Sequence, residues 1–282
     1  MSNSPARPRL KPLTDLVESP TGFRARKSLG QNFLVDENVL RKLRQAIDPK
    51  PADAFVEIGP GLGALTRHLV PAGCDYTAIE IDQRLVPLLR EQFTGAANCK
   101  ILHEDFRDTD LQRLAAGKQR KLRVVGNIPY HLTSVIIFKA FSQRAALADM
   151  ILTVQKEVAE RVTAQPGGKD YGILAVVSQT FASTTVLFNV SRHVFRPKPE
   201  VDSAVVRWVF RPLPLPLRDE EFYIAMVKAA FGQRRKTLRR SLATFMGTAD
   251  LAIEDAGLLQ RRPETLTINE LIGLANQLHQ MQ

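Results

Sequence analysis

Residues 54 to 64 read Ala54-Phe55-Val56-Glu57-Ile58-Gly59-Pro60-Gly61-Leu62-Gly63-Ala64. The first five residues are apolar apart from one glutamate, which predicts a buried strand. The glycines at alternate positions let backbone N–H groups approach a ligand closely at the start of a helix, which we expect to contain Leu65, Leu69 and Val70. The stretch therefore predicts a strand, a glycine loop and a helix that bind a ligand at the loop.

Two more β-rich runs follow, and each leads into acidic residues. Asp75 to Ile79 is followed by Glu80, and Lys100 to His103 is followed shortly by Asp105 and Phe106. Strands that alternate with helical segments are typical of a parallel, doubly wound α/β sheet. We therefore expect a Rossmann-like sheet whose ligand lies at the carboxyl ends of the strands.

The glycine loop leaves two kinds of ligand open. Gly59-x-Gly61-x-x-Ala64, with Glu80 about 20 residues later, satisfies the relaxed dinucleotide pattern, so an NAD enzyme is one alternative. Glu57 argues against it, because a negative charge two residues before the first glycine disfavours a pyrophosphate. The same charge suits a ligand with ammonium and sulfonium groups, and S-adenosylmethionine is such a ligand.

Each acidic residue at a strand end has a role in the S-adenosylmethionine interpretation. Glu80 accepts hydrogen bonds from the ribose hydroxyls, Asp105 accepts one from the adenine amine of the cofactor, and Phe106 packs on its ring. The alternative is that acidic residues at strand ends only cap helices, as Asp108 could do ahead of Leu111.

Asn127-Ile128-Pro129-Tyr130 follows a strand expected over Lys121 to Val125, and Pro129 prevents a helix from starting at once. An exocyclic adenine amine is a poor nucleophile because its lone pair is delocalised into the ring. The carboxamide oxygen of Asn127 and the carbonyl of Ile128 can each accept one amine hydrogen, while Tyr130 stacks on the base. The motif predicts methylation of an amino group, in which geometry sets the rate. Taken alone, these four residues could equally form a plain turn.

A second polar loop runs from Lys27 to Leu34 and precedes a helix that we expect Asp36 to cap. It combines positive charge, a glycine and the two amides Gln31 and Asn32, which together favour a binding loop. The alternative is that both amides are ordinary surface residues.

Composition restricts the class of protein. The chain has 282 residues, of which 44% are hydrophobic, and no apolar run approaches the roughly 20 residues that a membrane span needs. The net charge of +10 favours a polyanionic partner such as nucleic acid. Cys74 and Cys99 form no metal or disulfide pattern, and the histidines lack metal-ligand spacing, so we expect no metal and a location in the reducing cytoplasm.

Prolines and charges divide the chain. Residues 1–26 should form a mobile basic tail, 27–212 a cofactor-binding catalytic domain, and 213–282 a small helical domain beyond the proline-rich run of residues 211–216. Two basic segments, Arg192 to Pro199 and Gln233 to Arg240, suit phosphate contact. The first could instead be a rigid connector, and the second a solvated charged face. The residues expected to bind RNA are Arg196, Lys198, Arg234, Arg235 and Lys236.

Five motifs occur in order: Gln31-Asn32-Phe33-Leu34, Glu57-Ile58-Gly59-Pro60-Gly61, Asp105-Phe106, Asn127-Ile128-Pro129-Tyr130 and Phe231-Gly232-Gln233-Arg234-Arg235-Lys236-Thr237-Leu238. With them the chain resembles the KsgA (RsmA) family of small-subunit ribosomal RNA adenine dimethyltransferases, from about Arg26 to near its C-terminus. The resemblance implies a class I S-adenosylmethionine-dependent methyltransferase. Such an enzyme methylates N6 of two adjacent adenines in the hairpin loop near the 3′ end of small-subunit (16S) rRNA.

The resemblance also implies roles for particular residues. By motif position, Asn127, Ile128 and Tyr130 hold the target base. Including Gly61 and Phe106 from the interpretation above, the expected cofactor contacts are Asn32, Leu34, Gly59, Gly61, Glu80, Asp105, Phe106 and Asn127. The expected partner is small-subunit rRNA within an assembling 30S particle, bound by a monomer.

Two departures from the family pattern matter. Ile128 stands where members often have Leu or Pro, which is harmless if only the backbone carbonyl acts. Arg239 and Arg240 stand where many relatives carry amides, so the end of that RNA surface is less defined. The rivals are the erythromycin-resistance methylases, which act on large-subunit rRNA, and a non-catalytic assembly or transcription factor of the same fold. The run from Val201 to Val206 and the motif from Phe231 to Leu238 favour the KsgA family.

Overall fold

The computed structural model describes residues 13, 23–233, 236–247, 251 and 253–281. The chain forms two compact units, one of Met1–Gln155 with Leu187–Val205 and the other of Lys156–Val186 with Val206–Gln282. This division differs from the boundary expected between residues 212 and 213, because the second unit takes in helices that precede the proline-rich run. A separate helical domain from residue 213 stays a prediction.

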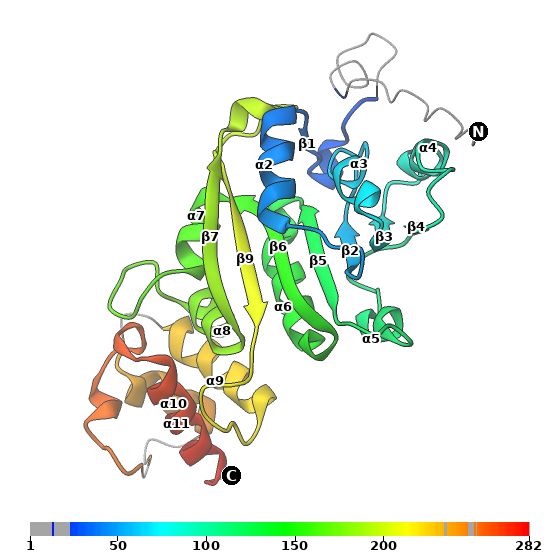
Figure 1. Cartoon of the computed structure of the whole chain (residues 1–282). Coiled ribbons are helices and arrows are strands. Elements are labelled where there is room, and N and C mark those ends of the chain that lie inside the picture. The colour runs from blue at the N-terminus through cyan, green and yellow to red at the C-terminus, as the bar shows by residue number, and fades with distance from the viewer. Residues whose placement is uncertain (1–12, 14–22, 234–235, 248–250, 252, 282) are drawn as a thin grey trace, which may run out of the picture. The chain divides into compact units, whose positions relative to one another are not determined.

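Within the described residues, the main sheet has seven strands in the order β4-β3-β2-β5-β6-β9-β7, which can be followed across Figure 1. The first five of these are joined by parallel pairings, as the alternation of strands and helices predicts. Strands β9 and β7 each run from one unit into the other. The strands are β2 (Ala54–Ile58), β3 (Asp75–Glu80), β4 (Cys99–His103), β5 (Leu122–Asn127), β6 (Leu147–Gln155), β7 (Ala182–Val190) and β9 (Ser203–Phe210).

The helices of the first unit alternate with its strands. Asp36 caps the first of them by accepting from the backbone N–H groups of Asn38 and Val39, as predicted. The helix that begins at Leu111 is capped by Asp110 and not by Asp108. The carboxylate of Asp110 accepts hydrogen bonds from the backbone N–H groups of the first turn. These helices are α2 (Glu37–Ile47), α3 (Thr66–Leu69), α4 (Leu85–Gln92), α5 (Leu111–Ala115) and α6 (Thr133–Ser142).

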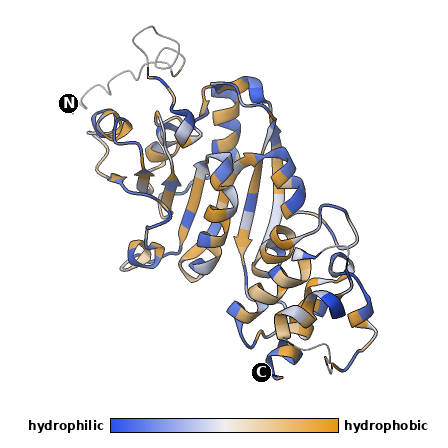
Figure 2. Ribbon diagram, turned by 180° about the vertical axis from the view of Figure 1, so that it is seen from behind, coloured by the Kyte–Doolittle hydropathy of each residue, from blue (hydrophilic) through white to orange (hydrophobic). Residues whose placement is uncertain are grey.

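Apolar residues of the strands form the core of the first unit. Every residue of β2 is buried, and Figure 2 shows hydrophobic residues running along the central strands. Because strands buried on both faces cannot alternate with polar residues, β2 reads as a continuous apolar run with the single exception of Glu57. The core therefore holds the carboxyl ends of β2, β3 and β5 in fixed register.

A small antiparallel sheet joins two distant segments of the first unit. Strand β1 (Phe33–Leu34) pairs with β8 (Phe195–Arg196), and the backbone N–H of Val35 donates to Val194. The pairing anchors the C-terminal end of the polar loop that precedes β1. This loop begins with a short 3₁₀ helix, η1 (Lys27–Leu29).

The second unit is mainly helical. Its helix α9 packs against α8, α10 and α11, and Tyr223 on α9 shares a 2.8 Å hydrogen bond with Thr180 on α8. Helix α11 begins with a capping box formed by Thr267 and Glu270. The helices of this unit are α7 (Lys156–Val162), α8 (Ile173–Phe181), α9 (Glu220–Gly232), α10 (Leu238–Met246) and α11 (Ile268–His279).

The segment before η1 is not a free tail throughout. Most of residues 1–22 lie outside the described residues, but Leu13 is buried in the core of the first unit. Residues 23–26, which the sequence suggested belonged to a mobile tail, make specific contacts described below. Among the described helices, none is long and apolar enough to cross a membrane.

Candidate functional site

One cavity in the first unit lies at the carboxyl ends of β2, β3, β4 and β5. Ten of the residues that the sequence suggested for the cofactor or the base form part of its wall. They are Asn32, Leu34, Gly59, Gly61, Glu80, Asp105, Phe106, Asn127, Ile128 and Tyr130. Distant parts of the sequence therefore meet at the edge of the sheet where parallel α/β proteins bind ligands.

The glycine loop forms an open cradle at this edge. Gly59 and Gly61 have φ values of +62° and +59°, a conformation that favours glycine. A Cβ atom on Gly59 would meet nothing within 4 Å, whereas one on Gly61 would lie 3.0 Å from the ring of Phe33. Gly59 thus leaves backbone accessible to a ligand, while Gly61 lets the loop pack against the segment from β1.

Glu80 braces the loop from the end of β3. One carboxylate oxygen accepts from the backbone N–H of Gly61 at 3.0 Å, and the other accepts from the N–H of Asp82 at 2.8 Å. Only 3% of Glu80 is exposed, and burial raises the pKa of its carboxyl group. Each oxygen keeps a further lone pair, so Glu80 can also accept hydrogen bonds from a ligand in the cavity.

Glu57 differs from the sequence expectation in its charge. Its carboxyl group is buried and accepts from the hydroxyls of Thr66 at 2.5 Å and Tyr76 at 2.8 Å. Burial raises its pKa to about 7, because desolvation outweighs the two hydrogen bonds. Burial therefore weakens the negative charge that the sequence suggested for Glu57.

Asp105 is held by a residue that the sequence did not single out. Its carboxylate accepts two hydrogen bonds from the guanidinium of Arg107 through Oδ2, at 3.0 and 2.6 Å. The backbone N–H of Arg107 donates to Oδ1 at 2.8 Å. These bonds lower the pKa of Asp105, which therefore stays ionised and can accept from an amine.

Asn127 lies at the end of β5 with its side chain oriented by the polar loop. Its amide nitrogen donates to the backbone carbonyl of Asn32 at 2.8 Å. This contact assigns the amide, since the carboxamide oxygen could not face a carbonyl. The oxygen of Asn127 is consequently the group that is left to accept a hydrogen bond in the cavity.

Tyr130 is fixed at its hydroxyl. The hydroxyl lies 2.6 Å from Oγ of Ser203, at the start of β9, and burial raises the pKa of the phenol. Tyr130 is the first residue of the 3₁₀ helix η3 (Tyr130–Leu132), directly after Ile128 and Pro129, and it is half-buried. An aromatic ring anchored in this way at the wall of a cavity offers a stacking surface.

Three residues of the site escaped the sequence analysis. Ser203 and Arg107 are known as partners only once the chain is folded. Ile81 lines the cavity with 45% of its surface exposed, which is unusual for a large apolar residue next to buried Glu80. Its place directly after the acidic end of a strand was the signal that could have identified it.

The residues suggested for RNA binding lie elsewhere. Arg196 is in β8, where its guanidinium donates to the carbonyls of His193 and Phe195, and Lys198 is exposed. Lys236 is exposed in the second unit. Arg234 and Arg235 lie outside the described residues. Among the residues that the structure describes, no group of three or more His, Cys, Asp or Glu is arranged to hold a metal ion.

Comparison with known proteins adds sequence relatives. A family model described as ribosomal RNA adenine dimethylase matches residues 22–272. The protein named ribosomal RNA small subunit methyltransferase A from Pelotomaculum thermopropionicum is 44% identical, over 90% of this chain and 92% of the relative. The protein of the same name from Prosthecochloris aestuarii is 41% identical, over 96% of this chain and 100% of the relative.

Two solved structures are similar over most of the chain. A dimethyladenosine transferase from Plasmodium falciparum has a TM-score of 0.71 and 23% identity, covering 87% of this chain and 96% of its own. The 23S rRNA methyltransferase ErmE has a TM-score of 0.62 and 26% identity, covering 88% of this chain and 100% of its own. The α/β fold and its Rossmann-like sheet are thus shared with methyltransferases.

Proposed function

The chain belongs to the ribosomal RNA adenine dimethylase family, and we propose that it methylates N6 of two adjacent adenines in the 3′-terminal hairpin loop of small-subunit rRNA to give N6,N6-dimethyladenines. The family makes it an rRNA adenine dimethyltransferase. The relatives named for the small subunit, at 41 and 44% identity, support the small-subunit substrate over the large-subunit rRNA of ErmE at 26%.

S-adenosylmethionine is the proposed methyl donor. When bound, it supplies an electrophilic methyl carbon on a cationic sulfur. The open backbone at Gly59 and the buried acceptor Glu80 fit its methionine and ribose parts, and Asp105 with Phe106 fits its adenine. The proposed cofactor residues are Asn32, Leu34, Gly59, Gly61, Glu80, Asp105, Phe106 and Asn127. An NAD enzyme falls behind, because it leaves the Asn127 motif without a role.

The observation that carries the proposed chemistry is the orientation of Asn127. Its nitrogen is committed to Asn32, so its oxygen is available to accept one hydrogen of the target amine. The carbonyl of Ile128 accepts the other hydrogen, and the ring of Tyr130 stacks on the base. In the first transfer both hydrogens are held, which favours a pyramidal nitrogen with its lone pair directed at the methyl donor. The monomethylated amine keeps one hydrogen, so one of the two acceptors holds it in the second transfer. The methyl group would come from the sulfonium of bound S-adenosylmethionine, which Gly59, Glu80 and Asp105 would hold, and the ammonium formed on the base would lose a proton to solvent.

The target adenines must leave their stack to reach this cavity, which costs least in a hairpin loop. The basic segments around Arg196, Lys198, Arg234, Arg235 and Lys236 are proposed to hold the RNA backbone, since phosphate contacts position a nucleic acid without reading its sequence. The proposed substrate particle is an assembling small subunit in the cytoplasm, and the enzyme is proposed to act as a monomer.

Labelled S-adenosylmethionine incubated with purified protein and undermethylated small ribosomal subunits tests the proposal. We expect dimethyladenine in the small-subunit hairpin and none in large subunits. Label in large-subunit RNA would assign the chain to the resistance type of methylase, and cofactor binding without label would make it a binding factor.

A matched pair of variants tests the role of Asn127. Asn127→Ala removes the acceptor, so turnover should fall by at least about 100-fold, as for loss of a catalytic hydrogen-bonding group. Gln112→Ala removes an exposed amide on α5 that does not line the cavity, and it should retain turnover. Near wild-type turnover of Asn127→Ala would contradict the proposed mechanism.

A further inference from the structure

The loop that closes one side of the cavity has little structure of its own. Leu29, Gly30, Gln31 and Asn32 all line the cavity, yet Leu29 ends the one-turn helix η1 and the other three lie between η1 and the two-residue strand β1. Elements this short do not hold a loop by themselves. Contacts from elsewhere in the fold must therefore hold it in place.

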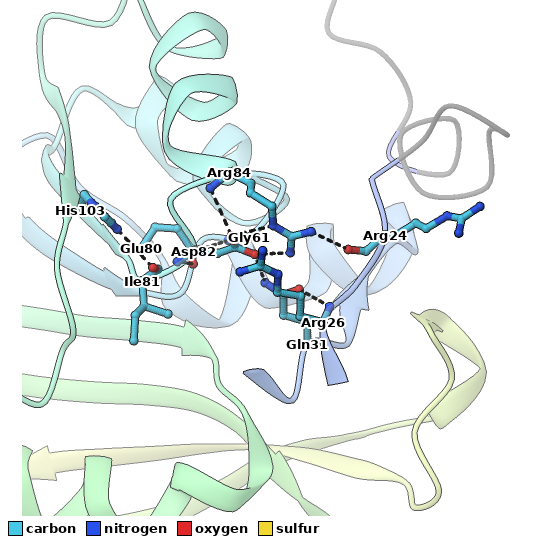
Figure 3. Close-up of polar contacts among 9 residues, drawn as sticks. All are labelled: Arg24, Arg26, Gln31, Gly61, Glu80, Ile81, Asp82, Arg84 and His103. Atoms are coloured by element: carbon cyan, nitrogen blue, oxygen red, sulfur yellow. Dashed lines mark hydrogen bonds and ion pairs between the residues drawn. The ribbon is translucent and has the colours of Figure 1, made fainter. Parts of the chain in front are cut away.

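Asp82 and Arg84, in the turn between β3 and α4, supply such contacts (Figure 3). Asp82 is 1% exposed, and one of its oxygens accepts from the side-chain amide of Gln31 at 2.9 Å. The same carboxylate accepts from Nη2 of Arg84 at 2.5 Å and from Nε at 2.9 Å. The pair is bidentate, a geometry that orients both side chains.

Arg84 and Gln31 extend this contact to the segment before the loop. The guanidinium of Arg84 donates to the carbonyl of Arg24 at 3.3 Å and lies 4.5 Å from the ring centre of Phe23. The amide oxygen of Gln31 accepts from the backbone N–H of Arg26 at 2.8 Å. Both ends of the segment are thus tied to Asp82.

The same cluster continues to the cofactor side. The backbone N–H of Asp82 donates to Glu80, and the other oxygen of Glu80 accepts from Gly61 in the glycine loop. A continuous chain of hydrogen bonds therefore connects the glycine loop, through Glu80 and Asp82, to Gln31 in the loop of residues 27–32. Figure 3 shows Glu80, Asp82 and Arg84 side by side with Gln31.

We propose that Asp82 and Arg84 are positioning residues that hold the loop of residues 27–32 closed over bound S-adenosylmethionine, and so set how long the cofactor stays bound. The inference rests on the proposed cofactor. Neither side chain touches the reacting atoms; they act through Gln31 and the backbone of Arg24. If only a fraction of the molecules has the loop closed, the apparent affinity for S-adenosylmethionine is reduced in proportion to that fraction.

Arg84→Ala is the decisive variant, because Arg84 is partly exposed and its removal leaves no cavity in the core. We expect the dissociation constant for S-adenosylmethionine to rise about tenfold, the effect of losing one charge-assisted contact, through faster dissociation. Turnover at saturating cofactor should stay within about twofold, and the KM for RNA should not change. Arg84→Lys keeps the charge but not the bidentate geometry, so its dissociation constant should lie between those of the wild type and Arg84→Ala.

Arg90→Ala is the matched control, since Arg90 is an exposed arginine on α4 and makes one 3.4 Å contact with Ile101. Trypsin cleavage after Arg26 or Lys27 gives an independent measure of loop opening. Cleavage without cofactor should be faster in Arg84→Ala than in wild type or Arg90→Ala, and cofactor should suppress it.

Three outcomes would overturn the inference. The first is unchanged affinity in Arg84→Ala, with or without faster cleavage. The second is an equal loss in Arg90→Ala, and the third is a fall in turnover and thermal stability that matches the loss of affinity. If the wild-type protein itself fails to bind S-adenosylmethionine, the proposed function fails first, and that result is distinct from a wild type that binds and a variant that binds equally well.

Discussion

The hydrogen bond between Tyr130 and Ser203 makes a quantitative prediction about catalysis. Ser203 is fully buried and its hydroxyl lies 2.6 Å from that of Tyr130. Tyr130→Phe and Ser203→Ala each remove this bond but leave the aromatic ring in place. A neutral hydrogen bond contributes about 1 kcal/mol net, which corresponds to about fivefold in rate. If the bond orients the stacking ring, each single variant should lower kcat/KM for the RNA by about fivefold.

The double variant distinguishes orientation from two unrelated effects. Because both single changes break the same bond, Tyr130→Phe with Ser203→Ala should also lose about fivefold, and not the roughly 25-fold that independent effects would give. Tyr130→Ala removes the ring as well, and stacking on a base contributes about 1–3 kcal/mol, so its loss should be larger. Single-turnover methylation of undermethylated small subunits, at saturating S-adenosylmethionine, measures all four.

Two controls accompany this comparison of the single and double variants. The dissociation constant for S-adenosylmethionine should not change, since neither residue is among the proposed cofactor contacts. Tyr171→Phe removes the hydroxyl of a tyrosine in the second unit and should leave kcat/KM within about twofold. Additive losses in the double variant, or an unaffected Tyr130→Phe, would show that Ser203 does not orient the ring.

Two further predictions concern the cavity wall. The pKa of Glu57 is raised from 4.5 to about 7, so the buried carboxylate costs stability as pH rises, and between pH 5 and 8 the wild type should lose about 2–3 kcal/mol of unfolding free energy relative to Glu57→Gln. Urea unfolding at both pH values measures this, and parallel pH dependences would refute it. Gly30→Ala should weaken cofactor binding, because Gly30 has a φ of +61° and a Cβ atom there would lie 2.9 Å from the His131 ring. Gly73→Ala is the control: Gly73 has a φ of +80°, but a Cβ atom there would meet nothing within 4 Å. This variant adds backbone strain without a clash and should bind cofactor normally.

Much of the fold follows from local pattern. The apolar run before Gly59 predicted β2 to the residue, and Asp36 was recognised as a cap because an acidic residue preceded a helical period. Strand ends in a parallel sheet share one edge, so the acidic ends of β3 and β4 could be placed at a common ligand. Periodicity and strand-end chemistry carry this information within short windows.

The partners of the site residues could not be found in the same way. Ser203 lies 73 residues from Tyr130, and no local rule connects them. Asp82 and Arg84 are only two residues apart in sequence, but their proposed function depends on Gln31, 51 residues away from Asp82. The raised pKa of Glu57 could not be foreseen either, because burial is a property of the folded chain.

The two halves of the cavity differ in how firmly they are held. Asn127 and Tyr130 are each fixed by a protein partner that leaves the chemically useful face free. Asp105 is instead bound by Arg107, whose side chain is 51% exposed. Because the guanidinium is half exposed, a ligand amine can share the Asp105 carboxylate with Arg107. Rigidity is therefore greatest around the target base, where the proposed mechanism depends on the direction of a lone pair. The pocket for the adenine of the cofactor, where only affinity is at stake, can adjust.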